Sequence, residues 1–396
     1  MELVRTGKPI VIRMRKDLLR SIKRGHVWLY SNAIEIVDAP SGSVGILQDR
    51  KGERIASGIY DPRHAIPLRI CRTDRQLSLD DAWLTQRLYQ AWELRKNFFD
   101  PIFTDGFRMV AGEGDGVPGL VIDVYGKSAV IKLDGGAPEQ FYKTQGIANW
   151  LAENCGITTV VQRFRDQNMG SLELLGTVGS SKVSFLENGL QFQADILRGQ
   201  KTGFFLDQRD NRHLIRQLSN ARRVLNLFSY NGGFSIAAGT GGAKHVTSVD
   251  LAPLAIESAQ EIWEVNGLPP KWHDGVVTDC FEFLESAIRS KQSWDIVICD
   301  PPSFAPSEST RPQALAAYGR LAGLAARVTT PGGFLALASC SSHIDMHAFS
   351  EANENEIGRA RRKAMLFAER GLPLDHPTPL AMPELRYLKF QLFQLA

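Results

Sequence analysis

The sequence predicts an α/β protein in which a Rossmann-like, doubly wound parallel sheet follows an N-terminal β-barrel-like domain and a central α+β domain. Two observations carry this prediction. From about residue 194 onward, short apolar strands alternate with segments of helix length, which is the βαβα rhythm of a parallel sheet. In the first 75 residues, short apolar runs are instead separated by glycines, as in a small barrel. The predicted domains therefore span residues 1–75, 76–193 and 194–396.

The N-terminal domain combines strands with an uneven charge. Apolar runs at 9–13 and 66–71 predict strands, and residues 15–24 predict a short basic helix that ends at Gly25. Residues 1–75 contain 15 Lys and Arg against 8 Asp and Glu, a net charge of +7, whereas the remainder contains 31 against 35, a net charge of −4. A basic front end favours an anionic partner, although charge alone leaves a solvated basic face as the alternative.

The central domain mixes helix and hairpin signals. Ser78 precedes apolar residues at helical spacing, so it is the expected N-cap of a helix. A second helix is expected from about residue 138 to residue 154, with Gly156 at its C-terminal end. Asn188-Gly189 is a strong hairpin signal and predicts two paired strands within residues 183–193.

Composition excludes several classes of protein. Hydrophobic residues make up 43% and charged residues 22%, which is typical of a soluble globular chain. No run of 18 apolar residues exists and the N-terminus lacks the apolar core of a secretory signal, so we expect a cytoplasmic protein with no membrane partner. The five cysteines show no C-x-x-C spacing, which argues against a zinc site and a disulfide framework. No metal is expected.

Polar residues follow successive strands of the predicted parallel sheet. The strands are expected at residues 223–228, 245–250, 294–300 and 333–338. The turn at 228–235 contains glycine, so its backbone can approach a ligand at the carboxyl edge of the sheet. Asp250 can accept hydrogen bonds from both hydroxyls of a ribose, Asp279 suits an adenine amino group, and Asp300 ends a fourth edge position. Each acid alone could be a helix N-cap or a turn residue, but together and in order they resemble motifs I to IV of the class I methyltransferases.

The candidate substrate end lies beyond the last two of these strands. In residues 300–304 (DPPSF), prolines hold the turn rigid and expose Asp300 to a planar substrate. Cys340, immediately after the next strand, would face the same site. Cys299 is the rival thiol, but neighbouring residues of an extended strand point to opposite faces, so we interpret Cys299 as a core residue. An inert thiol at Cys340 is the alternative that remains open.

A cysteine and an acid at this edge suit methylation of a pyrimidine at carbon 5. That carbon is too weak a nucleophile to attack a sulfonium methyl group unaided, and a thiolate that adds to carbon 6 generates the enamine that can attack. A nearby acid can hold or supply a proton at N3 as charge develops. Cys340 and Asp300 fit these two catalytic roles.

Over nearly its whole length the chain resembles the RlmI-type 23S rRNA cytosine-C5 methyltransferases, whose N-terminal domain is a PUA domain. The motifs that carry the resemblance are residues 25–31 (GHVWLYS), 112–123 (GEGDGVPGLVID), 199–209 (GQKTGFFLDQR), 226–235 (NLFSYNGGFS), 300–304 (DPPSF), 338–342 (ASCSS), 375–377 (DHP) and 383–389 (PELRYLK). The resemblance implies a PUA-like domain, a central domain and a methyltransferase domain that uses S-adenosylmethionine (SAM). It also implies 23S rRNA as the RNA partner and a possible homodimer.

The resemblance implies a role for individual residues. The expected SAM-binding residues are Gln208, Arg209, Phe228, Ser229, Tyr230, Asn231, Gly232, Asp250, Asp279 and Asp300. Cys340 is the implied nucleophile. The expected substrate-binding residues are Pro301, Pro302 and Phe304 at the base, and Arg20, Lys23 and Arg24 in the basic front end, with further RNA contacts from a groove beside the central domain.

Two departures and two other functions qualify this interpretation. Ser303 stands where the family often has lysine, and residues 341–343 (SSH) follow the cysteine instead of a Ser-Gly pair. Methylation of an exocyclic base nitrogen is one alternative, but it would leave Cys340 without a role. A non-catalytic RNA-binding assembly factor is the other, and the intact edge acids argue against it.

Overall fold

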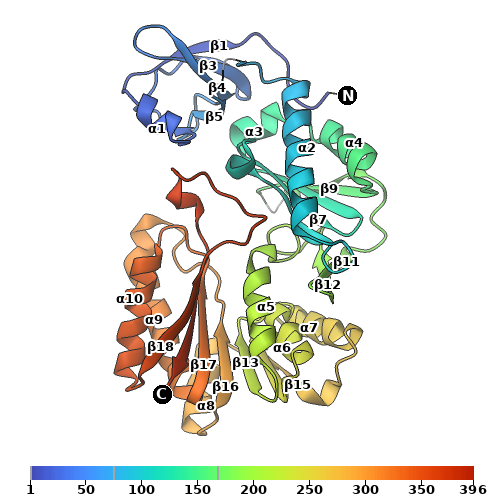
Figure 1. Ribbon diagram of the computed structural model, residues 1–396, viewed down its shortest axis with the longest axis vertical. Coiled ribbons are helices and arrows are strands. Elements are labelled where there is room, and N and C mark those ends of the chain that lie inside the picture. Colours follow the sequence, from blue (N-terminus) through green and yellow to red (C-terminus); the bar gives the residue numbers. More distant parts are fainter. Residues whose placement is uncertain (1, 75, 167–168) are drawn as a thin grey trace. The chain divides into compact units, whose positions relative to one another are not determined.

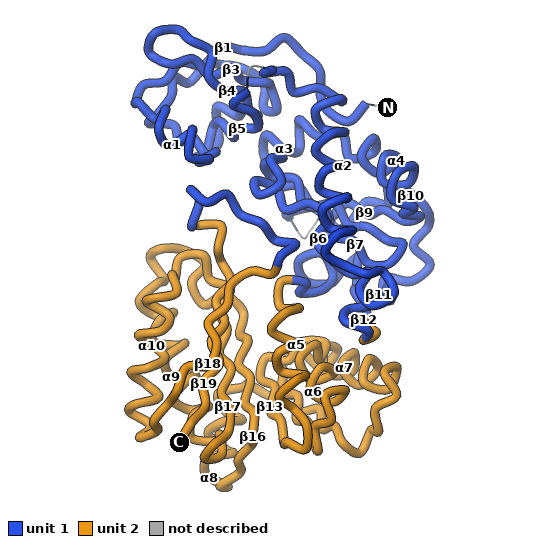
Figure 2. The backbone as a smooth tube through the Cα atoms, viewed as in Figure 1, with its two compact units in different colours: residues 1–189, 193–206, 374–383 blue, residues 190–192, 207–373, 384–396 orange. Residues whose placement is uncertain are grey.

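The computed structural model describes residues 2–74, 76–166 and 169–396. The chain forms two compact units, each assembled from three segments (Figure 2). Unit 1 comprises residues 1–189, 193–206 and 374–383, and unit 2 comprises residues 190–192, 207–373 and 384–396. The predicted first domain begins and ends at residues 1 and 75, which both lie outside the described residues.

The N-terminal part of unit 1 is a five-stranded sheet of order β1-β3-β4-β5-β2, in which β1 and β3 are parallel and the other pairs antiparallel. Its elements are β1 (Ile10–Arg13), α1 (Leu19–Lys23), β2 (Trp28–Leu29), β3 (Ser43–Gln48), β4 (Arg54–Tyr60) and β5 (Leu68–Arg72). Ile12, Leu47 and Tyr60 are buried in its core. The basic helix α1 is shorter than the predicted 15–24 segment.

The central part of unit 1 is a sheet of order β10-β9-β8-β7-β6 with helices packed against it (Figure 1). Its elements are α2 (Asp81–Phe98), β6 (Gly106–Ala111), η1 (Gly112–Asp115), β7 (Leu120–Tyr125), β8 (Ser128–Leu133), α3 (Gly136–Phe141), α4 (Thr144–Cys155), β9 (Thr159–Arg163) and β10 (Ser171–Leu175). Trp83 and Leu84 of α2 share one buried cluster with Ile122 of β7. This strand and helix content confirms the predicted α+β class.

Two local predictions in this region are wrong. The N-cap of α2 is Asp80, whose carboxylate accepts a hydrogen bond from Trp83 N at 2.9 Å, and Ser78 lies outside the helix. The helix expected over 138–154 is two helices, α3 and α4, because the chain is extended at Tyr142. The hairpin prediction is confirmed by β11 (Lys182–Glu187) and β12 (Leu190–Asp195), with Asn188 and Gly189 at φ 51° and 77°.

Unit 2 contains a seven-stranded sheet of order β15-β14-β13-β16-β17-β19-β18. Its strands are β13 (Arg223–Leu227), β14 (His245–Asp250), β15 (His273–Val277), β16 (Trp294–Cys299), β17 (Thr329–Ser339), β18 (Ala364–Arg370) and β19 (Lys389–Leu395). The first five are parallel, whereas β19 is antiparallel to both β17 and β18. The doubly wound parallel sheet predicted from the sequence is therefore confirmed, with an antiparallel extension on one side.

Helices cover both faces of this sheet. They are α5 (Arg209–Leu218), α6 (Gly233–Thr240), α7 (Pro253–Val265), α8 (Cys280–Arg289), α9 (Arg311–Val328) and α10 (Met346–Arg359), with single-turn helices η3 (Leu206–Gln208), η4 (Pro270–Trp272), η5 (Glu308–Thr310) and η6 (Pro383–Leu385). Neighbouring residues of β16 point into different cores. Ile298 packs with α5, α6 and α7, and Val297 packs with α8, α9 and α10. Burial on both faces explains why these strands read as continuous apolar runs.

The connection between β18 and β19 contains residues 374–383, which belong to unit 1 and which we call the strap. Within unit 1, the backbone oxygen of Asp375 accepts a hydrogen bond from Arg95 Nη2 at 2.9 Å, and both side chains are fully buried. A Cβ on Gly114 would lie 1.9 Å from the Pro377 carbonyl oxygen, so only glycine allows this approach. The motifs at 112–123 and 375–377 thus contact each other in the fold.

No helix in the described part of the chain has the length and apolar character needed to span a membrane.

Candidate active site

The turn between β13 and α6 has an unusual backbone. Phe228, Tyr230 and Gly232 have φ angles of 56°, 47° and 79°, and two of these are not glycine. Such left-handed residues are held by their surroundings. Tyr230 N donates to Asp250 Oδ2 at 2.8 Å, and Phe228 N donates to Cys280 Sγ at 3.2 Å. Neighbouring elements therefore fix this turn in place.

The same turn packs closely on α7 and leaves one polar group without a partner among the described residues. A Cβ on Gly232 would lie 2.8 Å from the Ala259 Cβ, so a larger residue would push the turn away from α7. The Ser229 hydroxyl is in a side chain only 5% exposed and has no hydrogen-bond partner among the described residues. A buried hydroxyl of this kind is costly unless a bound molecule or water completes it.

Two of the predicted acids have defined backbone partners. Asp250, at the end of β14, accepts hydrogen bonds from Tyr230 N and, at 2.9 Å, from Ala252 N. Each of its oxygens keeps a second lone pair. Asp279 is the N-cap of α8, and its Oδ1 accepts from Phe281 N at 2.8 Å. The N-cap alternative is thus what the structure shows for Asp279, and its second oxygen is not used in the cap.

Gln208, which directly precedes α5, contacts Asp300, which directly follows β16. Gln208 Nε2 donates to Asp300 Oδ1 at 2.9 Å. Asn211, on the first turn of α5, donates from Nδ2 to Gln208 Oε1 at 2.7 Å and so orients the amide of Gln208. Arg209, between them, is 2% exposed. The structure therefore brings the 208–209 motif to the carboxyl end of β16, and Asn211 is a member that the sequence did not indicate.

The loop after β16 presents an aromatic side chain. Pro301 is buried, Pro302 is exposed, and Phe304 is half-buried against Tyr318, with ring centroids 4.8 Å apart. Cys299 is fully buried, and burial raises the pKa of its thiol well above the usual value. Its interpretation as a core residue is therefore confirmed.

Cys340 follows β17 and is half-buried. The next residue, Ser341, is the centre of several hydrogen bonds, which we call the Ser341 hub. The Ser341 hydroxyl lies 2.9 Å from Ser303 Oγ and 2.8 Å from the Tyr318 hydroxyl. Lys389 Nζ donates to the Ser341 carbonyl oxygen at 2.5 Å. The loop after β16 and the turn after β17 are thus tied together.

Sequence reasoning assigned no role to Tyr318, Ser341 or Lys389, although Ser341 and Lys389 lie within the motifs at 338–342 and 383–389. Lys389 did carry a signal, because it opens a strand whose following residues are mostly apolar. Tyr318 carried none, since tyrosine is common outside functional sites.

The residues predicted to bind RNA phosphates lie on and beside α1. Arg20, Lys23 and Arg24 are exposed, and together with Asp17 and Leu19 they line a surface depression in unit 1. The basic side chains predicted from the sequence are thus gathered at one place.

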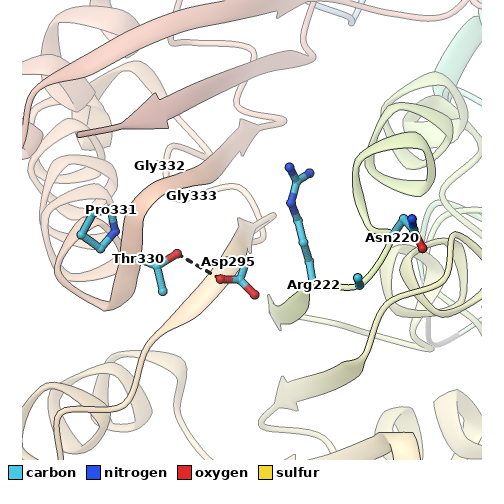
Figure 3. A pocket seen from close by; sticks show the side chains of 8 residues that line it. Asn220, Arg222, Asp295, Thr330, Pro331, Gly332 and Gly333 are labelled. Atoms are coloured by element: carbon cyan, nitrogen blue, oxygen red, sulfur yellow. Dashed lines mark hydrogen bonds between the residues drawn. The ribbon is translucent and has the colours of Figure 1, made fainter.

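A second hollow lies at the opposite, amino end of the sheet in unit 2. It is lined by residues that include Arg222, Asp295 and Thr330, and Thr330 Oγ1 donates to Asp295 Oδ1 at 3.2 Å (Figure 3). None of the predicted site residues borders it. Ligands of open α/β sheets bind at the carboxyl ends of the strands, so this hollow is not the candidate active site.

Within the described ranges, no cluster of three or more His, Cys, Asp or Glu side chains is arranged to hold a metal ion.

Comparison with known proteins identifies the family and the fold of this chain. A family described as S-adenosylmethionine-dependent methyltransferase matches residues 139–359, and a PUA-like domain matches residues 12–73. Among solved structures, a Streptococcus mutans protein described as a SAM-dependent methyltransferase has a TM-score of 0.83 at 23% identity, covering 97% of this chain and all of that one. A methyltransferase structure in complex with SAH has a TM-score of 0.86 at 24% identity, covering 98% of this chain and 100% of its own. These two likenesses show the fold.

The fold and the two family matches together define a SAM-dependent methyltransferase with a PUA-like domain. The ribosomal RNA large subunit methyltransferase of Deinococcus radiodurans is 37% identical over 97% of both chains. The ribosomal RNA large subunit methyltransferase I of Photobacterium profundum is 33% identical over 96% of this chain and 97% of its own. The chain belongs to the ribosomal RNA large subunit methyltransferase I family.

Proposed function

We propose that this methyltransferase forms 5-methylcytosine in 23S rRNA through a covalent adduct of Cys340. The observation that carries the proposal is the half-buried Cys340 at the carboxyl end of β17, joined by the Ser341 hub to the loop that follows Asp300. The names of the relatives support a large-subunit rRNA substrate. The choice of cytosine carbon 5 rests on the thiol chemistry.

The residues around the β13 turn fit SAM. The proposed set combines the Asp250 carboxylate for the ribose hydroxyls, Asp279 for the adenine amino group, and the turn 228–232 with its unpartnered Ser229 hydroxyl for the remaining polar groups. Gln208 and Arg209 complete it from the start of α5. When bound, SAM supplies an electrophilic methyl group.

The chain's own side chains would do the rest of the chemistry. The Cys340 thiolate forms a bond to carbon 6 of the cytosine, and the electron pair moves toward N3, where Asp300 holds or supplies a proton. Carbon 5 then takes the methyl group as the bond from that group to the sulfonium sulfur breaks. Transfer of the carbon 5 proton to water, with return of the N3 proton to Asp300, breaks the bond between Cys340 and carbon 6 and restores both the thiolate and the aromatic ring. Pro302, which is exposed, and Phe304, which is half-buried, are the side chains that we propose to hold the flipped base.

RNA affinity would come from the basic helix. Arg20, Lys23 and Arg24 are exposed together on and beside α1, and cations of this kind bind phosphates in a salt-dependent way without reading sequence. Base choice would then come from extrusion of the target nucleotide. A homodimer and a cytoplasmic location stay predictions.

The test is transfer of labelled methyl groups from SAM to 23S rRNA that lacks its own methylations, followed by nucleoside analysis. Cys340→Ala should abolish 5-methylcytidine formation and leave SAM binding intact, whereas Cys155→Ala, a change at another half-buried cysteine, should leave both 5-methylcytidine formation and SAM binding unchanged. Full activity of Cys340→Ala would contradict the covalent mechanism. Methylation of an exocyclic amine would favour the first alternative, and absence of both transfer and SAM binding would favour a binding protein.

A further inference from the structure

Lys389 is a buried cation whose charge is not neutralised by an acid. Its side chain is 2% exposed, and Nζ donates to two neutral acceptors, Ser341 O at 2.5 Å and Tyr387 O at 2.7 Å. Among the described residues Lys389 has no ion pair. A buried ammonium without a carboxylate partner is costly, so its retention calls for an anion that forms nearby.

The position of Lys389 in the sheet points to that anion. Lys389 opens β19 and stands opposite Ser339, the last residue of β17, in the antiparallel register. Cys340 is the next residue after Ser339, and the carbonyl that accepts from Lys389 belongs to Ser341. Lys389 therefore meets the residues on both sides of Cys340, through the strand pairing of its backbone with Ser339 and through the hydrogen bond of its ammonium to Ser341 O.

Two other ionisable groups near this turn, Asp345 and Tyr318, do not form an ion pair with Lys389. Burial lowers the pKa of Lys389 to about 8, while the charges of Cys340 and Asp345 act in the opposite direction. Asp345 is exposed and its carboxylate caps α10 through Ala348 N. The Tyr318 hydroxyl is buried, and burial raises its pKa, so it stays neutral beside Ser341.

We propose that Lys389 is a positioning residue that holds Cys340 in its thiolate form and fixes the turn from which the thiolate attacks. This inference rests on the proposed function, because it gives Cys340 the part of nucleophile. It adds the source of the thiolate, since a cation close to a thiol favours its ionised form by roughly one to three pH units.

The experiment is the pH dependence of alkylation of Cys340 by iodoacetamide in the full-length protein, followed site by site with mass spectrometry. It needs neither RNA nor methyl transfer, so its outcome is independent of whether cytosine carbon 5 is the target. The other thiols interfere little: burial raises the pKa of Cys155 and Cys280 to about 12, and Cys71 and Cys299 are buried.

We expect Cys340 in the wild type to ionise well below the ordinary thiol value of about 8.5. Lys389→Met should raise the midpoint by at least about one pH unit and slow alkylation at pH 7 about tenfold. Lys389→Arg should keep most of the wild-type midpoint if it folds, and Lys271→Met, at an exposed lysine, should change nothing.

A midpoint that does not move in a folded Lys389→Met protein would overturn the proposal. If that variant does not fold, the wild type alone decides, because a Cys340 midpoint at or above the ordinary thiol value contradicts it. If the wild type formed no 5-methylcytidine but its Cys340 ionised with a low midpoint, that result would count against the proposed substrate atom and leave the role of Lys389 standing.

Discussion

Replacing Asp250 with alanine tests the proposed ribose contact in the most direct way. The carboxylate already accepts one backbone hydrogen bond at each oxygen, from Tyr230 N and Ala252 N, and each oxygen has one lone pair left for a ribose hydroxyl. The change would remove both ribose hydrogen bonds and also release the β13 turn at Tyr230, whose backbone is left-handed. The loss should therefore fall on cofactor binding more than on global stability.

The size of the effect follows from the hydrogen bonds. A hydrogen bond to a charged group contributes about 1.5–3 kcal/mol, so two bonds to the ribose amount to about 3 kcal/mol at the lower limit. Since about 1.4 kcal/mol corresponds to a tenfold change in affinity, the Kd for SAM should rise by roughly a hundredfold or more. Asp250→Asn keeps one acceptor but turns an amino group toward a backbone N–H, and it should fall between wild type and alanine.

Isothermal titration with SAM, and separately with SAH, measures this directly. The matched control is Asp274→Ala, an exposed acid on the neighbouring strand β15, which should bind both ligands normally. The thermal midpoint of each ligand-free variant shows whether the fold is retained. A folded Asp250→Ala protein that binds SAM within threefold of wild type would refute the assignment of this acid to the ribose.

Two further predictions concern RNA binding and acid stability. The double change Arg20→Glu and Lys23→Glu should weaken RNA binding. In filter binding from low to high salt, the slope of log affinity against log salt should fall in magnitude by about one for each phosphate that the protein no longer neutralises. An unchanged slope would mean that α1 does not bind phosphate. His273 is buried, is bonded to Ser248 Oγ at 2.7 Å and Gln260 Oε1 at 2.9 Å, and burial lowers its pKa from 6.5 to about 4. The folded state then binds fewer protons than the unfolded state between these values, so the free energy of unfolding should fall as pH drops through this window, by at most about 3 kcal/mol. Urea unfolding at pH 4.5 and pH 7 should show a smaller difference for His273→Gln, and equal differences would contradict the buried neutral histidine.

The sequence predicted well what depends on local patterns. Apolar runs buried on both faces, such as 294–299, predict parallel strands, and an acid directly after such a run must lie at the carboxyl edge of the sheet. Asp250 and Asp300 were found in this way. The turn residues Asn188 and Gly189 were equally readable, because few residues adopt a left-handed backbone without strain.

Features set by distant parts of the chain were out of reach. The helix predicted over 138–154 is interrupted because Lys143 N donates to Leu3 O, a partner that no local pattern reveals. The insertion of β19 between β17 and β18 is likewise a matter of pairing, and with it the approach of Lys389 to the turn after Ser339. Local propensity cannot anticipate such pairing, since tertiary packing overrides it.

The strap has a consequence for how such a protein can be divided or recombined. Because each unit is assembled from three segments, no single cut of the chain separates the two. A chimera that exchanged residues 207–396 for those of a distant relative would import a foreign strap. The carbonyl oxygen at position 375 of that strap must accept from the recipient's Arg95, and its backbone must pass the recipient's Gly114. Residues 207–396 therefore cannot be exchanged as an independent part. Any substitutions in the strap, residues 374–383, must stay compatible with the rest of unit 1.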